Sequence, residues 1–257
     1  MPDTDLWLAT TVVDLAEIFD AGASEAEYAD TLTERLAARL APAEIGLLIA
    51  SNQDRLAVVA TCSQHVGELA SLQIRLDEGP VLDCHRNGQA VLNESTATAN
   101  ERWPQFAPAA RTGGFGVVSA LPMRRRGQSV GVIFAAAGEY RLAQEDVHNI
   151  SVLARVAAVA IAQQRDLRRS VLAAEQLQRA LDSRVLIEQA KGAVAARLGI
   201  SPGAAFELLR AYARQGNLTL VEVASRTIPN NLTPHDLMAA YEARRNGEAY
   251  AGRVAHS

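Results

Sequence analysis

The segment RVLIEQAKGAVAARLGISPGAAFELLRAYARQGNLTLVEVASRTI, residues 184–228, predicts three short helices separated by two breaks. Ser201 followed by Pro202 is a typical helix start, and so is Thr219 with Glu222 three residues later. Apolar residues recur at steps of three and four through the first of these helices: Ile187, Ala190, Val194 and Leu198. The segment therefore predicts a small all-α bundle.

A lysine and a glycine, Lys191 and Gly192, stand side by side within the first helix, where packing alone does not require them. Arg184 precedes Lys191 by seven residues, which places the two cations within about 20° of each other around the helix. Gly192 leaves room for a bulky partner beside the backbone. Arg210 and Arg214 lie one turn apart on the second helix. Two helices with cation pairs suggest a surface that faces phosphates. The alternative is that these arginines contact only solvent, which would explain the same spacing.

The residues that carry a family resemblance are Arg184, Ile187, Ala190-Lys191-Gly192, Ser201, Ala205-Phe206, Leu209-Arg210, Leu220 and Val223-Ala224. In type and spacing the segment resembles the ANTAR domain. That resemblance implies a three-helix domain that binds RNA hairpins and acts as a transcription antiterminator. On this basis the cations of both helices are expected to contact RNA phosphates, and Gln189 and Thr219 to hydrogen-bond base or sugar. Phe206 is expected to face the core of the bundle.

The first part of the chain predicts an α+β domain. Helices are expected over residues 5–20 and after Ser24, which has Glu27 three residues on as in a capping box. Short β-like runs follow: EIGLLIA, DRLAVVAT, SLQIRL and AVLNES, and then FGVVSALPMRR and QSVGVIFAAAG as a hairpin. A short helix is expected over 80–87, and the RWPQFAPAARTGG stretch predicts a loop and another short helix. This order predicts an antiparallel sheet covered by helices.

The stretches DEGPVLDCHRNGQAV, RWPQFAPAA, VVSALPM and SVGVIFAAAG are similar to those of GAF domains, as in actinobacterial GAF–ANTAR regulators. The resemblance implies a pocket for a small ligand between the sheet and its covering loops, but it identifies no cofactor. Cys84, Trp103 and Phe106 are candidate ligand contacts. The aromatic loop is either a lid over a pocket or a plug over the sheet, and Cys62 and Cys84 are either a redox pair or small buried hydrophobes.

A nearly unbroken helical pattern runs from Asp146 to about Leu198, and apolar residues follow it at alternating steps of three and four. The seam consists of Ile150, Leu153, Ala157, Ala160, Gln164, Leu167, Val171, Ala174, Gln178, Leu181 and Val185. It predicts a parallel coiled coil between two copies of the chain, and the alternative is a long helix packed on its own domain. The expected organisation is a GAF-like domain over 1–145, a coiled-coil linker over 146–183, an ANTAR domain over 184–229 and a polar tail over 230–257.

Charge is divided unevenly along the chain. Residues 1–164 hold 12 Lys+Arg against 20 Asp+Glu, and residues 165–257 hold 13 against 9, so the net charge changes from −8 to +4. No nucleotide-binding, hydrolase or metalloprotease motif is present, and no metal-ligand spacing. The sequence predicts no enzyme and no metal, a cytoplasmic location with no membrane span, and a homodimer that binds RNA. The rival classes are a DNA-binding regulator and a ligand sensor that binds no nucleic acid.

Overall fold

The computed structural model describes residues 2–228, 236–239 and 242, and the chain divides into two compact units, Met1–Leu167 and Arg168–Ser257. The helices of the first unit are α1 (Pro2–Asp20), α2 (Glu25–Leu40), α3 (Gln64–Leu76), α4 (Pro80–Asn87) and α5 (Phe106–Thr112). Its strands are β1 (Glu44–Ala50), β2 (Leu56–Thr61), β3 (Val91–Ser95), β4 (Val117–Arg125) and β5 (Gln128–Ala137). Helix α6 (Gln144–Leu198) begins in this unit and ends in the second, where α7 (Pro202–Gln215) and α8 (Leu220–Thr227) follow.

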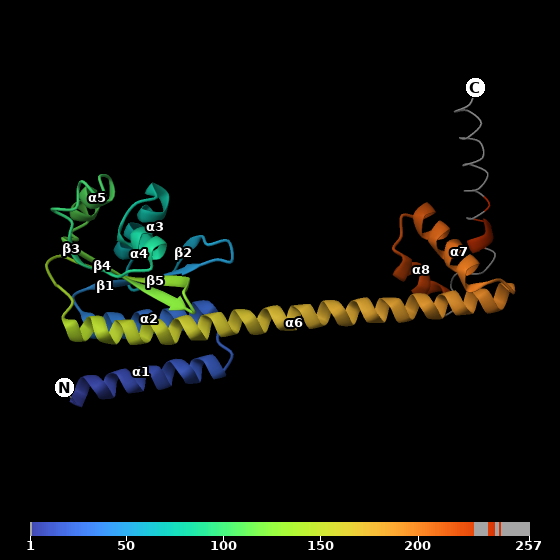
Figure 1. The fold of residues 1–257 in the computed structure, drawn as a ribbon, viewed down its shortest axis with the longest axis horizontal. Helices are drawn as coiled ribbons and strands as arrows, with labels where there is room; N and C mark the ends of the chain where they lie inside the picture. Colours follow the sequence, from blue (N-terminus) through green and yellow to red (C-terminus); the bar gives the residue numbers. More distant parts are fainter. Residues whose placement is uncertain (1, 229–235, 240–241, 243–257) are drawn as a thin grey trace, which may run out of the picture. The chain divides into compact units, whose positions relative to one another are not determined.

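The five strands form one antiparallel sheet in the order β2-β1-β5-β4-β3. Figure 1 shows α1, α2 and the first part of α6 on one side of the sheet, and α3, α4 and α5 on the other. Alternate residues of β1 and β5 therefore enter two separate cores. Ile45, Leu47 and Ile133 face the side of α2 and α6, whereas Leu48 and Phe134 face the side of α3, α4 and α5. Coverage of both faces explains why the central strands are almost uniformly apolar.

The predicted caps are confirmed. The Ser24 hydroxyl accepts the Glu27 N–H at 3.2 Å, and the Ser24 N–H donates to the Glu27 carboxylate at 2.7 Å. The predicted helix over 80–87 is α4, which ends at Gly88 in the left-handed conformation with a φ of 66°. The predicted antiparallel sheet and its hairpin of β4 and β5 are also present.

The prediction of a strand at SLQIRL is wrong, because residues 71–76 are the end of α3. Ser63 is the N-cap of this helix, and its hydroxyl accepts the Val66 N–H at 3.2 Å. Its buried residues recur at helical steps: Val66, Leu69, Ala70 and Gln73. The six-residue window was too short to show this period. The side-chain amide oxygen of the buried Gln73 also accepts the Val81 N–H at 2.8 Å, which connects α3 to the start of α4.

The long helix is confirmed, but the first part of the predicted seam does not face a partner. Ile150, Leu153 and Ala157 are fully buried in the core on the face of the sheet that α2 and α6 cover. Gln164 donates to the Ala23 carbonyl at 2.5 Å, so it also bonds within its own domain. Later positions of the predicted seam are exposed, among them Leu167, Val171, Leu181 and Val185.

Candidate nucleic-acid interface

The second unit builds a small core from the end of α6, α7 and α8. Its buried members are small or aliphatic: Ala190, Val194, Ala205, Leu208, Leu209, Ala213, Val223, Ala224 and Leu237. Ser201 caps α7 by accepting the Ala204 N–H at 3.2 Å. Leu237 belongs to the stretch expected as a polar tail, and most of that stretch lies outside the described residues. A core of this kind fixes which faces of the three helices remain open to a partner.

The predicted cations lie on those open faces. Arg184 on α6 and Arg210 and Arg214 on α7 are exposed. The Arg210 guanidinium lies 3.7 Å from the Glu207 carboxylate, which is a loose contact between two exposed side chains. Among the residues that the structure describes, no carboxylate lies within ion-pair distance of Arg184 or Arg214. The structure thus brings two cation-bearing helices into one unit.

Lys191 is the one lysine in the sequence, and it is half-buried beside a carboxylate. Its ammonium lies 2.5 Å from the Glu188 carboxylate, with 23% of the Lys191 side chain and 56% of the Glu188 side chain exposed. Ion pairs at this degree of exposure contribute about 0–1 kcal/mol. A competing phosphate can therefore replace Glu188 at little energetic cost.

The other residues predicted to contact RNA are Gln189, Thr219 and Gly192, and each has a different environment. Gln189 is exposed on α6. Thr219 is the N-cap of α8, where its hydroxyl accepts the Glu222 N–H at 3.2 Å and donates to the Glu222 carboxylate at 2.8 Å. The Thr219 backbone N–H also donates to the Glu222 carboxylate, at 2.7 Å. This bond first, and then the bond from the Thr219 hydroxyl, lowers the pKa of Glu222. Gly192 has open space where a Cβ would project, so no neighbour among the described residues requires glycine there.

One aromatic residue differs from its predicted role. Phe206 was expected in the core of the bundle, but it is half-buried and does not belong to the core cluster or to the side chains packed against it. Phe206, Arg210 and Arg214 follow at steps of four on α7, so each is turned about 40° from the previous one. The four-residue spacing of an aromatic and two cations was visible in the sequence, and it is the signal that the core assignment overlooked.

The candidate ligand contacts of the first unit are buried in its second core. Cys84 and Phe106 are fully enclosed and Trp103 is 1% exposed. The two aromatic rings meet edge to face with their centroids 5.8 Å apart. The Trp103 indole donates to the Asp83 carboxylate at 3.0 Å, and the Arg102 guanidinium covers the ring at 4.8 Å. The three side chains are thus members of one buried core, on the side of the sheet that α3, α4 and α5 cover.

The two thiols differ sharply in environment, and this predicts different reactivity. Burial raises the pKa of the Cys84 thiol to about 12, whereas Cys62 is exposed and its sulfur accepts the Ile45 N–H at 3.1 Å. Because the thiolate is the reactive form, we expect a thiol reagent at pH 8 to modify Cys62 and leave Cys84 intact until the protein unfolds. Peptide mass spectrometry after timed labelling measures this, and equal rates at both sites would contradict it.

Groups of acidic, histidine and cysteine side chains that could hold a metal ion are absent from the described part of the chain. Across the same residues, no helix combines the length and the apolar character that a membrane span needs.

Comparisons with known proteins match one domain family to the first part of the chain and another to the second. A family model described as GAF domain matches residues 22–162, and one described as ANTAR domain matches residues 175–228. No curated protein matches the sequence significantly.

Many solved structures resemble the first unit. Two of them come from proteins of different kinds. The GAF domain from a phosphoenolpyruvate-protein phosphotransferase of Coxiella burnetii has a TM-score of 0.50 and 16% identity, over 64% of this chain and 98% of that one. The free methionine-R-sulfoxide reductase from Neisseria meningitidis, in complex with its substrate, has a TM-score of 0.50 and 11% identity, over 64% and 93%. At these identities the likeness shows the fold alone.

Proposed function

We propose that this chain, which belongs to the GAF domain family and carries an ANTAR domain after it, is a signal-responsive regulator that binds RNA hairpins and prevents transcription termination. Both domain types are regulatory. The observation that carries the proposal is the exposed set of cations on α6 and α7 within the ANTAR-matched residues. The preceding domain is net acidic, so RNA is drawn to this unit and away from the other.

The cations have defined parts in this proposal. Arg184, Arg210 and Arg214 contact phosphates directly, because they are exposed and arginine presents several donors in a planar fork. Lys191 exchanges Glu188 for a phosphate when RNA arrives. Gln189 lies between these cations in the sequence and is available for base or sugar contacts. The Thr219 hydroxyl is occupied by Glu222, so its part is to hold the start of α8.

Phe206 adds a means of recognising unpaired bases. RNA hairpin loops expose bases that stack on aromatic faces, and such stacking contributes about 1–3 kcal/mol per base. Phe206 is partly open and lies on the same side of α7 as Arg210. A loop base on Phe206 would place its phosphate near that arginine.

Gly192 tests the idea that RNA approaches the α6 backbone. Glycine within a helix is about 1 kcal/mol less favourable than alanine, and a Cβ at Gly192 would meet open space in the free protein. We therefore expect Gly192→Ala to stabilise the protein by about 0.5–1 kcal/mol and to weaken RNA binding. Urea unfolding and RNA titration of the same sample measure the two effects.

Gly203 offers a matched control for this experiment, because it is a helical glycine of α7 whose Cβ position has no atom closer than the Ser201 hydroxyl at 4.0 Å. Gly203→Ala should gain stability and keep the RNA affinity of the natural protein. If Gly192→Ala gained stability with RNA affinity unchanged, the close approach of RNA at Gly192 would be refuted.

The GAF domain supplies control in this proposal. The protein acts as a cytoplasmic homodimer, paired through the helical linker and the GAF domain, so that two RNA-binding units engage paired hairpins. A signal at the GAF domain shifts the population of dimers that present both surfaces.

The activity is tested by single-round transcription of a template whose leader forms two hairpins before a terminator. Added protein should raise the fraction of transcripts that read through, and a template with both hairpin loops replaced should not respond. Equal termination with and without the protein on the natural leader would contradict antitermination.

A further inference from the structure

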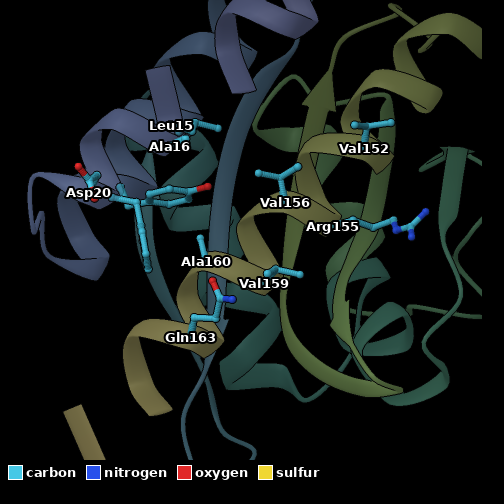
Figure 2. A pocket seen from close by; sticks show the side chains of 11 residues that line it. Leu15, Ala16, Asp20, Val152, Arg155, Val156, Val159, Ala160 and Gln163 are labelled. Atoms are coloured by element: carbon cyan, nitrogen blue, oxygen red, sulfur yellow. The ribbon is translucent and has the colours of Figure 1, made fainter. Parts of the chain in front are cut away.

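The first unit has a groove between α1, α2 and α6, with a volume of about 710 Å³. Figure 2 shows Val152, Val156 and Val159 from α6 and Leu15 and Ala16 from α1 around it. This largely apolar lining does not suit a polyanion, because phosphates that leave water need polar partners. An anionic partner of the first unit must therefore bind elsewhere.

Two turns lie next to each other at one end of the sheet: residues 51–55 connect β1 to β2, and residues 126–127 connect β4 to β5. Strands β1 and β5 are antiparallel neighbours, so the end of β1 lies beside the start of β5. The His85 ring contacts both hairpins, with Ser129 of β5 at 2.7 Å and Asp54 of the first turn at 3.1 Å. At about 4.8 Å between strands, the two hairpins are about 10 Å apart.

Arginines gather around these turns, although the unit is acidic as a whole. They are Arg55, Arg124, Arg125, Arg126 and, on α6, Arg165. Arg165 lies at this end of the sheet because its guanidinium donates to the carbonyl of Ala50, the last residue of β1, at 2.7 Å. Residues 1–164 hold 20 Asp+Glu against 12 Lys+Arg, so this group of arginines is a local exception in charge.

The carboxylates next to these arginines already have basic partners. The Arg165 guanidinium lies 2.7 Å from the Glu25 carboxylate. The Arg125 guanidinium lies 2.7 Å from the Asp166 carboxylate. In the first turn, Asp54 faces the histidine ring. Five arginines stand against these three carboxylates, so the group has an excess of positive charge.

The excess charge belongs to Arg55 and Arg126. Both are exposed, and among the described residues neither has a carboxylate within ion-pair distance. The backbone at Arg55 is fixed, since its N–H donates to the Ser51 hydroxyl at 3.2 Å and its carbonyl accepts the Ser51 N–H at 2.8 Å. Both guanidinium groups thus extend from defined turns and can donate to an anion.

Arg126 occupies a position that does not favour arginine. Both residues of its two-residue turn have a positive φ, 50° at Arg126 and 84° at Gly127. Turns of this kind favour Asn-Gly, because asparagine adopts the left-handed conformation more readily than most residues. The arginine therefore does not serve the turn, which points to a role in binding.

The positive charge of the turns continues in the sequence of α6. Residues 144–164 hold one arginine and two acids, whereas residues 165–198 hold six arginines and one lysine against four acids. The change of sign falls at Arg165, the arginine that bonds the end of β1. The cationic part of α6 thus begins at the turns and ends in the unit that is proposed to bind RNA.

We infer that the turns over residues 51–55 and 126–127 form a second RNA-binding surface, on which Arg55 and Arg126 contact phosphates. The inference rests on the RNA binding of the proposed function and adds a contact on the first unit. Neither turn contains an aromatic residue on which a base could stack. The surface therefore binds the RNA backbone and adds affinity without reading the sequence.

Arg126→Asn separates binding from folding. Asparagine suits the left-handed position, so the midpoint of urea unfolding should rise. Affinity for a two-hairpin RNA should fall about three- to fivefold, as for the loss of one favourable exposed ionic contact. Arg55→Ala should cause a similar loss, and the double variant a loss of about tenfold or more. The slope of log affinity against log salt should become smaller by about one for each arginine.

Arg141→Gln is the matched control. Arg141 is exposed beyond the other end of β5, where its guanidinium donates to the Asn93 carbonyl at 2.7 Å. The variant loses the same charge as Arg126→Asn and should keep RNA affinity within about twofold. An RNA with both hairpin loops replaced gives a second readout. Arg126→Asn should weaken binding of this RNA and of the natural RNA by the same factor, since both have the phosphates.

If the natural protein did not bind the two-hairpin RNA, the proposed function and this surface would both be refuted. If the natural protein bound and Arg126→Asn kept its affinity, the surface alone would be refuted. An equal loss in Arg141→Gln would have the same meaning, because it would show a general effect of charge. A loss confined to the RNA with natural loops would exclude a backbone contact. A lower urea midpoint for Arg126→Asn would also overturn the proposal, because the arginine would then serve the turn.

Discussion

Lys191→Ala is expected to weaken binding of a two-hairpin RNA by about 10- to 100-fold. A hydrogen bond to a charged group contributes about 1.5–3 kcal/mol, and about 1.4 kcal/mol corresponds to a factor of ten. The substitution also leaves the Glu188 carboxylate, now without its 2.5 Å ammonium partner, close to the RNA phosphates. Titration of labelled RNA at constant salt measures the loss, and the slope of affinity against salt should also become smaller.

Two control variants make this result specific. Arg179→Ala removes an equal charge from an exposed residue of α6 that precedes the three-helix core, and RNA affinity should stay within about twofold. Glu188→Gln removes the competing carboxylate and should strengthen RNA binding. If Lys191→Ala and Arg179→Ala reduced affinity equally, binding would depend on net charge alone and the site would be misassigned.

Trp103→Ala is expected to lower the free energy of unfolding of the first unit by about 3–5 kcal/mol, the usual cost of removing a large aromatic from a core. Trp103 is enclosed, packs on Phe106 and bonds Asp83. Urea unfolding followed by circular dichroism measures the loss.

The surface residue Leu92, on β3, is the control, and Leu92→Ala should cost far less because that side chain is 40% exposed. A loss below about 1 kcal/mol for Trp103→Ala would contradict a structural role and favour a movable lid.

Local signals in the sequence predicted most of the fold because the interactions concerned are local. Ser24, Ser201 and Thr219 cap helices through bonds to residues three positions away, so spacing alone identified them. The end of α3 was predicted wrongly because six residues are too few to show the helical period, which is clear only when Val66, Leu69, Ala70 and Gln73 are taken together.

Side chains on α6 and α7 show that helical spacing alone does not decide which apolar residues are buried. Leu153 and Leu167 are equally apolar and share one predicted seam, but the sheet covers the first and leaves the second exposed. Likewise, Phe206 is an aromatic next to the core residue Ala205 in the sequence, but it does not belong to the small core around Leu209. The ion pair of Lys191 with Glu188 was predictable from the sequence, since the two residues are three positions apart on one helix.

The most direct test of the RNA surface uses the fact that Lys191 is the one lysine in the sequence. Acetylation with an amine-reactive reagent therefore reports on this side chain, and the N-terminal amine of the same molecules serves as the reference. We predict that saturating two-hairpin RNA slows acetylation of Lys191 at least about tenfold relative to the N-terminus, whereas duplex DNA of equal length does not. Equal acetylation of Lys191 with and without bound RNA would contradict the account.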